Sequence, residues 1–177
     1  MVKENKEKSA KISPISHLKF GVQDLLRNNE IVRKFLGGRI DQVQTARYSD
    51  IGANDIPIIV VQTPEEESIS VNNYPQIDRT TVKLIIEIFA YADNTTKIDD
   101  VAFECRQIVG SANWRVIAGK DFDDVRHRKT TTSFDTVGQK LVCIAMLEFH
   151  TYYDAEFNFA DVAENLEGVS VQHGHIQ

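Results

Sequence analysis

The longest strand signal in the chain is the segment RTTVKLIIEIFAYAD, residues 79–93. Its positions alternate with a period of two, which is typical of a β-strand whose two faces meet different surroundings. The first face is wholly apolar and should meet core helices; it consists of Val82, Leu84, Ile86, Ile88 and Ala90. The second face is mixed, as in a half-covered sheet or a subunit contact; it consists of Lys83, Ile85, Glu87, Phe89 and Tyr91.

Other strand signals lie on both sides of this segment. Residues 39–48 alternate weakly, whereas residues 56–63 (IPIIVVQT) form a strong β run. Towards the C-terminus, residues 125–135 and 139–153 predict two more strands. Gly138, which lies between them, predicts the turn that joins them.

A polar segment, residues 64–78, separates the first two strong strands and contains two prolines and the triplet Glu65, Glu66 and Glu67. We expect its first proline to end the preceding strand. The segment then forms a long loop, which in a compact domain is usually functional or disordered. Residues 68–71 alternate, so part of this loop is expected to form an extended arm.

Three segments carry apolar residues at helical spacing. Residues 14–28 predict a helix that Ser13 caps, and residues 30–36 predict a shorter one. Residues 96–109 predict an amphipathic helix that Gly110 ends. This order of elements predicts an α+β single domain: a mostly antiparallel sheet of four to five strands with helices packed on one face, plus an extended arm or loop.

The two ends of the chain differ in composition from the middle. Residues 1–13 are charged and poor in apolar groups, so we expect a disordered segment before a domain at 14–154. Residues 155–177 form an acidic C-terminal extension without Lys or Arg. The formal net charge of −6 argues against a general nucleic-acid binder, which needs a concentrated basic face.

Targeting and redox signals are few. No apolar run is long enough to span a bilayer, and the first residues lack the apolar stretch of a secretory signal. We therefore expect no membrane association and a chain that stays in the cytoplasm where it is made. Cys105 and Cys143 are far apart in sequence and are expected to be buried, inert thiols.

Motifs of catalysis and ligand binding are missing. The sequence has no phosphate-binding glycine loop, no nucleophile elbow, and no H-E-x-x-H or C-x-x-C pattern. His173 and His175 are a weak alternative metal site in what is otherwise a flexible end. Glu87, Glu148 and His150 could serve acid–base chemistry in a small enzyme or ligand-binding domain, although a partner contact or a solvated face is favoured. We expect no enzyme activity, no cofactor and no metal.

Four segments resemble, in order and in character, the tail terminator or tail completion family of tailed bacteriophages, of the minor tail protein U type. They are IPIIVVQTPEEES (56–68), YPQIDRTTVKLIIEIFAYAD (74–93), KIDDVAFECRQIV (97–109) and DVRHRKTTTSFDTVGQKLVCIAMLEFHTYYD (124–154). In that family a strand ends in a Thr-Pro-Glu-like step, an Arg leads a long strand after an acidic loop, and an Asp-rich turn precedes a helix. The matching positions are Thr63-Pro64-Glu65, Arg79 and Asp99-Asp100.

This resemblance implies a non-catalytic virion protein of the tail or neck. Members of the family form a closed, usually hexameric ring on the last layer of the tail tube, which ends tube polymerisation and provides a head–tail joining surface. The implied partners are copies of the chain, the tail tube protein and a neck or head-completion protein, with a sheath terminal ring as a further candidate. DNA would pass through the lumen without sequence-specific binding. Another neck or head-completion ring protein is the alternative.

Candidate residues for the subunit and tube interface come from the mixed strand face, the polar arm, the basic start of the 125–135 strand and the C-terminal extension. They are Glu65, Glu66, Glu67, Tyr74, Arg79, Ile85, Glu87, Phe89, Tyr91, Arg126, Arg128, Phe157 and Phe159. The glutamate triplet is either a negative arm tip or part of a solvated loop. The apolar residues of the extension either clamp a neighbouring subunit or pack back on their own domain.

Overall fold

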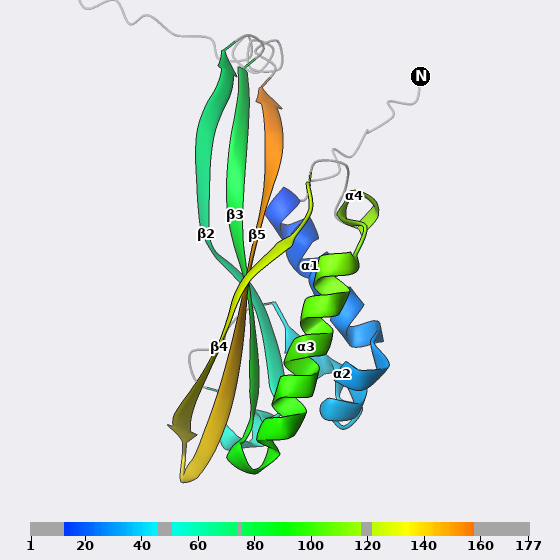
Figure 1. The fold of residues 1–177 in the computed structure, drawn as a ribbon, viewed down its shortest axis with the longest axis vertical. Coiled ribbons are helices and arrows are strands. Elements are labelled where there is room, and N and C mark those ends of the chain that lie inside the picture. The colour runs from blue at the N-terminus through cyan, green and yellow to red at the C-terminus, as the bar shows by residue number, and fades with distance from the viewer. Residues whose placement is uncertain (1–12, 46–50, 74–75, 118–121, 158–177) are drawn as a thin grey trace, which may run out of the picture.

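A computed structural model of the protein contains a five-stranded sheet in the order β1-β2-β3-β5-β4 (Figure 1). The structure describes residues 13–45, 51–73, 76–117 and 122–157. The strands are β1 (Val43–Gln44), β2 (Ile58–Asn73), β3 (Gln76–Tyr91), β4 (Arg126–Val137) and β5 (Lys140–Phe157). The helices are α1 (Pro14–Asn28), α2 (Glu30–Phe35), α3 (Thr95–Ser111) and α4 (Trp114–Ile117), with 3-10 turns at Ile40–Gln42, Ala53–Asp55 and Ala92–Asn94.

The sheet is mixed but mostly antiparallel. β2, β3, β5 and β4 pair antiparallel, while the two-residue β1 lies parallel to Ile59 and Val60 of β2. Helices α1, α2 and α3 lie together on one face of the sheet (Figure 1). The predicted α+β single domain is therefore confirmed. Within the described ranges, no helix combines the length and the apolar character needed to cross a membrane.

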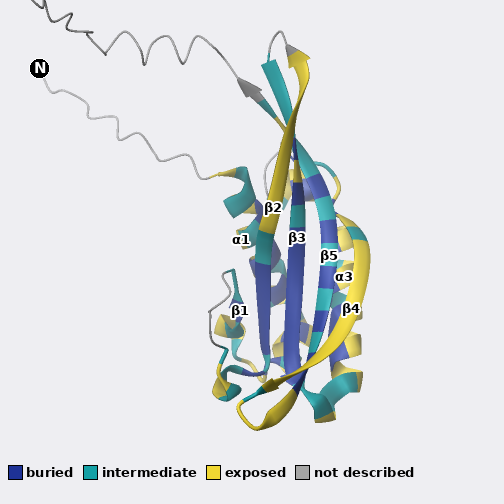
Figure 2. Ribbon diagram, turned by 90° about the vertical axis from the view of Figure 1, so that its left-hand side faces the viewer, coloured by how far each residue is buried: buried dark blue, intermediate teal, exposed yellow. Residues whose placement is uncertain are grey.

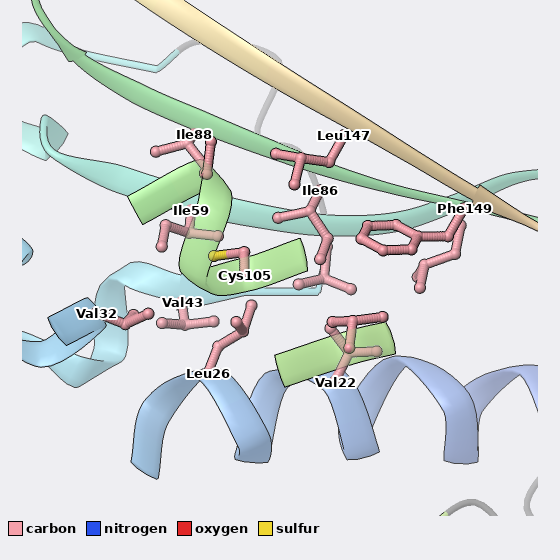
Figure 3. Packing of buried hydrophobic residues seen from close by; sticks show 14 of the residues in the cluster. Val22, Leu26, Val32, Val43, Ile59, Ile86, Ile88, Cys105, Leu147 and Phe149 are labelled. Carbon is pink, nitrogen blue, oxygen red and sulfur yellow. The ribbon is translucent and has the colours of Figure 1, made fainter. Parts of the chain in front are cut away.

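The core lies between the helices and the apolar face of β3 (Figure 3). All five residues predicted for that face are buried in one cluster with Leu18, Val22 and Leu26 of α1. Cys105 of α3 belongs to the same cluster. β5 contributes the alternate residues Cys143, Ala145, Leu147 and Phe149. The period of two in the strands and the helical spacing in α1 and α3 thus converge on one apolar layer.

The polar segment after the second strand signal is an arm of regular β-structure. The extended arm predicted at residues 68–71 is therefore present, whereas the loop predicted around it is wrong, because residues 64–67 and 72–73 also belong to β2 and residues 76–78 to β3. β2 continues through Pro64 to Asn73, pairs with β3 along its length, and shifts its register between Gln62 and Glu65. A register shift on an edge strand accommodates the proline, because no ladder hydrogen bond needs its missing N–H. β5 adds a third strand as far as Phe157, and the three strands extend together beyond the helices (Figure 1). Because solvent reaches both faces there, the arm shows no strong apolar alternation.

Two other predicted boundaries are wrong. Residues 39–48 were expected to form a strand, but Ile40–Gln42 form a 3-10 turn and β1 is confined to Val43–Gln44. Helix α3 continues through Gly110 to Ser111 instead of ending before it. Its last turn is held by Trp114, whose Nε1 donates a hydrogen bond to the Val109 carbonyl oxygen at 2.9 Å. That tertiary contact outweighs the local preference of glycine for a helix end.

The helix start predicted at Ser13 and the turn predicted at Gly138 are confirmed. The Ser13 hydroxyl accepts a hydrogen bond from the Ser16 amide at 3.2 Å, so Ser13 caps α1 as predicted. Gly138 has a φ of +64° in the β4–β5 turn, a conformation that glycine adopts at little cost. Both cysteines are free and buried. Burial raises the pKa of the Cys105 thiol to about 12, which makes it chemically inert.

Candidate assembly surface

Two strand edges of the sheet are unpaired in the part of the chain that the structure describes. β1 covers β2 at Ile59 and Val60, so β2 has a free edge from Gln62 to Asn73. β4 is the last strand on the other side of the sheet. Both free edges are exposed over most of their length (Figure 2). Such edges present rows of backbone donors and acceptors that can pair with another strand.

These edges carry opposite charges. The free part of β2 has no basic residue and bears three exposed carboxylates, which we call the acidic edge: Glu65, Glu66 and Glu67. The start of β4 bears three exposed cations, which we call the basic edge: Arg126, Arg128 and Lys129. The carboxylate of β4, at Asp135, lies towards the other end of that strand.

The acidic and basic edges meet at one level of the sheet and extend from it in opposite directions. Glu65 is paired with Lys83, Lys83 with His150, and His150 with Arg126. Directly paired residues share a face, so these four side chains form one row on the face opposite the helices. The row is negative at the β2 edge and positive at the β4 edge.

Much of the charge at the two edges has no ion-pair partner among the described residues. Lys83 Nζ lies 3.5 Å from Glu65 Oε2, in an exposed pair that contributes little stability. In the described ranges, by contrast, no ion pair joins Glu66, Glu67, Arg126 or Arg128 to another side chain. These four groups are therefore available to a second molecule.

The apolar members of the predicted interface on β3 are largely covered by their own chain. Phe89 is 3% exposed and packs in a small second cluster with Ile56, Ile58, Val60 and Val142. Ile85 is 9% exposed, so little of either side chain remains to contact another subunit.

Two polar members of that face are also engaged within the chain. Glu87 accepts a hydrogen bond from Gln62 Nε2 at 2.5 Å. Tyr91 donates a hydrogen bond to the Ala53 carbonyl oxygen, and the ammonium group of Lys140 lies 4.6 Å from its ring centroid. Among the remaining candidates, Tyr74 and Phe159 lie outside the described residues, and Phe157 is the last residue of β5. Their assignment to an interface stays a prediction.

An open hollow on the bare sheet face brings together two of the three residues considered for acid–base chemistry. Glu148 and His150 line it with Lys83, Thr81 and the acidic edge, whereas Glu87 does not. His150 Nε2 lies 3.0 Å from Glu148 Oε1, and Lys83 Nζ lies 3.8 Å from Glu148 Oε2.

The environment of Glu148 favours its ionised form. The hydrogen bond from His150 and the positive charges of Lys83 and Lys129 hold the pKa of Glu148 below its ordinary value. A carboxylate with a lowered pKa is a weak general base and is not protonated to act as an acid. The cluster is better described as part of the charged row that connects the two edges.

The arm is braced midway along its length by Arg79, the predicted leader of β3, which is paired with Ile69. Its guanidinium makes two hydrogen bonds of 2.8 Å to the carboxylate of Asp154 on β5 and lies 4.4 Å from the centroid of the Tyr152 ring. Tyr152 in turn donates a hydrogen bond to Asp123. A bidentate pair fixes geometry better than a single contact, so Arg79 holds β3 against β5. Through Tyr152 and Asp123, the same contacts reach the segment before β4.

We expect Arg79→Ala to loosen the arm without loosening the core. Hydrogen exchange should become faster at arm amides near Asp154 and stay unchanged at core amides near Ile86. The matched control is Arg106→Ala on α3, which removes an exposed arginine that stacks on Phe103. Equal exchange in the arm of both variants would contradict the bracing role.

The same contact predicts a pH dependence of arm protection. Hydrogen bonds from Arg79 lower the pKa of Asp154 from its ordinary value of 3.8. A group with a lowered pKa in the folded state contributes stability above its unfolded pKa and loses that contribution as pH falls through the folded value. Arm protection, corrected for the intrinsic exchange rate, should therefore fall below pH 3.8 in the wild type and change less in Arg79→Ala.

Several residues of the assembly surface escaped sequence reasoning. Lys129 belongs to the basic edge, and Asp154 and Tyr152 belong to the arm brace. The signal that could have found Asp154 and Tyr152 is the alternation of β5, which places both on the same face as His150. In the described ranges, no group of three or more His, Cys, Asp or Glu residues has the arrangement of a metal site.

Comparison with known proteins gives a likeness of fold. No family model matches the sequence, and no curated protein has a matching sequence. Among solved structures, the chain is similar to a chain in the virion of a native gene transfer agent (GTA) particle, with a TM-score of 0.54 and 11% sequence identity. The match covers 82% of this chain and 100% of that chain.

Proposed function

We propose that this chain is a structural virion protein of a phage-like particle that forms a ring on the end of the tail tube. The ring ends tube polymerisation and offers a joining surface to the head side. Its partners are further copies of the chain, with a hexamer as the expected ring, the tail tube protein and a neck protein. This role needs no catalysis, cofactor or metal.

The observation that carries the proposal is the open sheet with two long, free and oppositely charged edges. A subunit with two different binding surfaces joins head to tail and closes into a ring when the rotation between copies allows it. An enzyme of this size would more typically present a concave, mostly apolar pocket with a few polar groups. Among the described residues, an apolar hollow lies between α2 and α3, lined by Ile31, Lys34, Phe35, Lys97, Asp100 and Val101. The acidic and basic edges lie elsewhere, on strand edges and an open sheet face.

Two further observations support the proposal. The fold is similar to that of a chain in a gene transfer agent virion, which is an assembly of the same general kind. The net charge of −6 suits a channel for DNA, because a strongly basic wall would bind phosphates and slow their passage.

Tube length is the test of this function. The tail tube protein is polymerised with and without an excess of the chain, and tube lengths are measured by electron microscopy. We expect shorter tubes with extra ring-shaped density at one end. Tubes of the same unregulated length in both samples would contradict tail termination. Binding to a portal-side neck ring, with no effect on tubes, would favour the alternative role in the neck.

A further inference from the structure

The unpaired edges of the sheet match each other in length, direction and charge. We propose that the free edge of β2 in one copy pairs with the free edge of β4 in the next copy, with the acidic edge facing the basic edge. The occupant of each edge is thus a second copy of this chain. The inference rests on the proposed ring and specifies how its subunits join.

Charge favours this pairing over either form of self-pairing. If two β2 edges met, the carboxylates of Glu65, Glu66 and Glu67 would face their own copies. If two β4 edges met, the cations of the basic edge would do the same. Like charges placed opposite each other on neighbouring strands are destabilising, whereas opposite charges stabilise the pair. Only the β2–β4 contact satisfies both edges, and that contact is heterologous.

Strand direction also allows this pairing. β2 is antiparallel to β3, β3 to β5, and β5 to β4, so β2 and β4 run in opposite directions. A second copy placed beside the first in the same orientation therefore continues the antiparallel order across the contact. Both copies keep the same orientation along the ring axis. Rotation about a single axis relates the subunits of a closed ring in this way.

The position of the charged residues along the strands is compatible with a sheet that closes around the ring. Because Glu65 and Arg126 share one row, copies at equal height place Glu65 opposite Arg126. Four strands spaced by about 4.8 Å give each subunit a sheet about 19 Å wide. If the strands tilt by about 40° from the ring axis, the next copy is displaced along the strand direction by about 16 Å, or about five residues. If the shift moves the arm of one copy along β4 of the next copy, the contact between the two edges becomes longer. A shift in the opposite direction would separate the two edges. A shift of about five residues brings Glu67 opposite Thr130, next to Lys129, so the end of the triplet stays beside the basic edge.

Pairing would also remove the local positive charge of β4. The basic edge is the densest group of cations among the described residues of the sheet. Once the acidic edge of the neighbour lies beside it, it holds the phosphates of passing DNA less strongly. The same contact thus serves ring closure and an unobstructed lumen.

Charge reversal at edge residues that form no ion pair among the described residues tests the inference. The variant Glu66→Lys/Glu67→Lys has two positive edges, and the variant Arg126→Glu/Arg128→Glu has two negative edges. Each alone should associate with itself about 10- to 100-fold more weakly than the wild type. An equimolar mixture of the two, and a chain carrying all four substitutions, should recover association. The matched control for the Glu→Lys variant is Asp99→Lys/Asp100→Lys on α3, which makes the same charge change away from both edges and should associate as the wild type does.

Association is measured by sedimentation velocity alone and on tubes, with folding checked by circular dichroism. Unchanged or stronger association of the single-sign variants would overturn the inference, because the edge charges would then be irrelevant or would only keep the edges apart. A wild type that does not associate alone or on tubes would overturn it too. If all variants shorten tubes equally, the tail-terminating function stands and the edge contact is wrong. If association follows the charges but tubes stay unregulated, the edge contact stands and the proposed function is wrong.

Discussion

Phe149→Ala is expected to lower the free energy of unfolding by about 3–5 kcal/mol. The Phe149 side chain is fully buried in the main core cluster, opposite Leu84 on β3, and its ring centroid lies 5.4 Å from that of His127 in an edge-on contact. Removing the ring loses its transfer free energy and leaves a cavity beneath α1 and α3 that the stiff sheet cannot close. Urea denaturation followed by circular dichroism measures the loss.

Phe134→Ala is the matched control for this prediction. Phe134 lies on the neighbouring strand β4 and is 57% exposed, so its removal should cost less than about 1 kcal/mol. Equal losses in the two variants would show that the core is not the layer between the sheet and the helices.

Ile69→Asp/Val71→Asp is expected to abolish control of tube length while the protein stays folded. Ile69 and Val71 lie in the outer half of the arm and are 56% and 47% exposed, although both are apolar. Exposed apolar residues on the outer half of an extended arm are suited to a contact with the layer below, and placing carboxylates in that contact is costly. Electron microscopy of tubes should show lengths like those of the tube protein alone. The free energy of unfolding should change by about 1 kcal/mol or less.

Leu141→Asp serves as the control at the other end of the sheet. Leu141 is 53% exposed at the start of β5, far along the strand from the arm. The Leu141→Asp variant should still shorten tubes as the wild type does. If Leu141→Asp lost activity and the arm variant kept it, the opposite end of the sheet would be the one that binds the tube.

The sequence predicts those parts of the fold in which one face of an element is buried. The alternation of Val82 to Ala90 and the helical spacing in α1 and α3 reflect a single apolar layer, so each could be recognised locally. The arm could not, because solvent reaches both of its faces and its strand character depends on pairing with β3. β1 is too short to leave a periodic pattern, and its position beside Ile59 and Val60 is a tertiary property.

Some features of the candidate assembly surface could likewise be predicted from the sequence, and others could not. Glu65, Glu66, Glu67, Arg126 and Arg128 could be selected as unusual runs of charge. Their placement on opposite edges of one row could not, because it depends on a strand order in which β5 lies between β3 and β4. Phe89 was selected for an open face, but the segment around Ile56 folds over that end of the sheet and covers it. Such coverage by a distant segment leaves no local signal in the strand itself.

The most direct test of the account is a cryo-electron microscopy map of the tube end formed in the presence of the chain. We predict a closed ring in which β4 of every copy lies against β2 of its neighbour, with Glu67 near the Arg126–Lys129 segment across each contact. A ring built from β2–β2 and β4–β4 contacts, or a tube end without any copy of the chain, would contradict it.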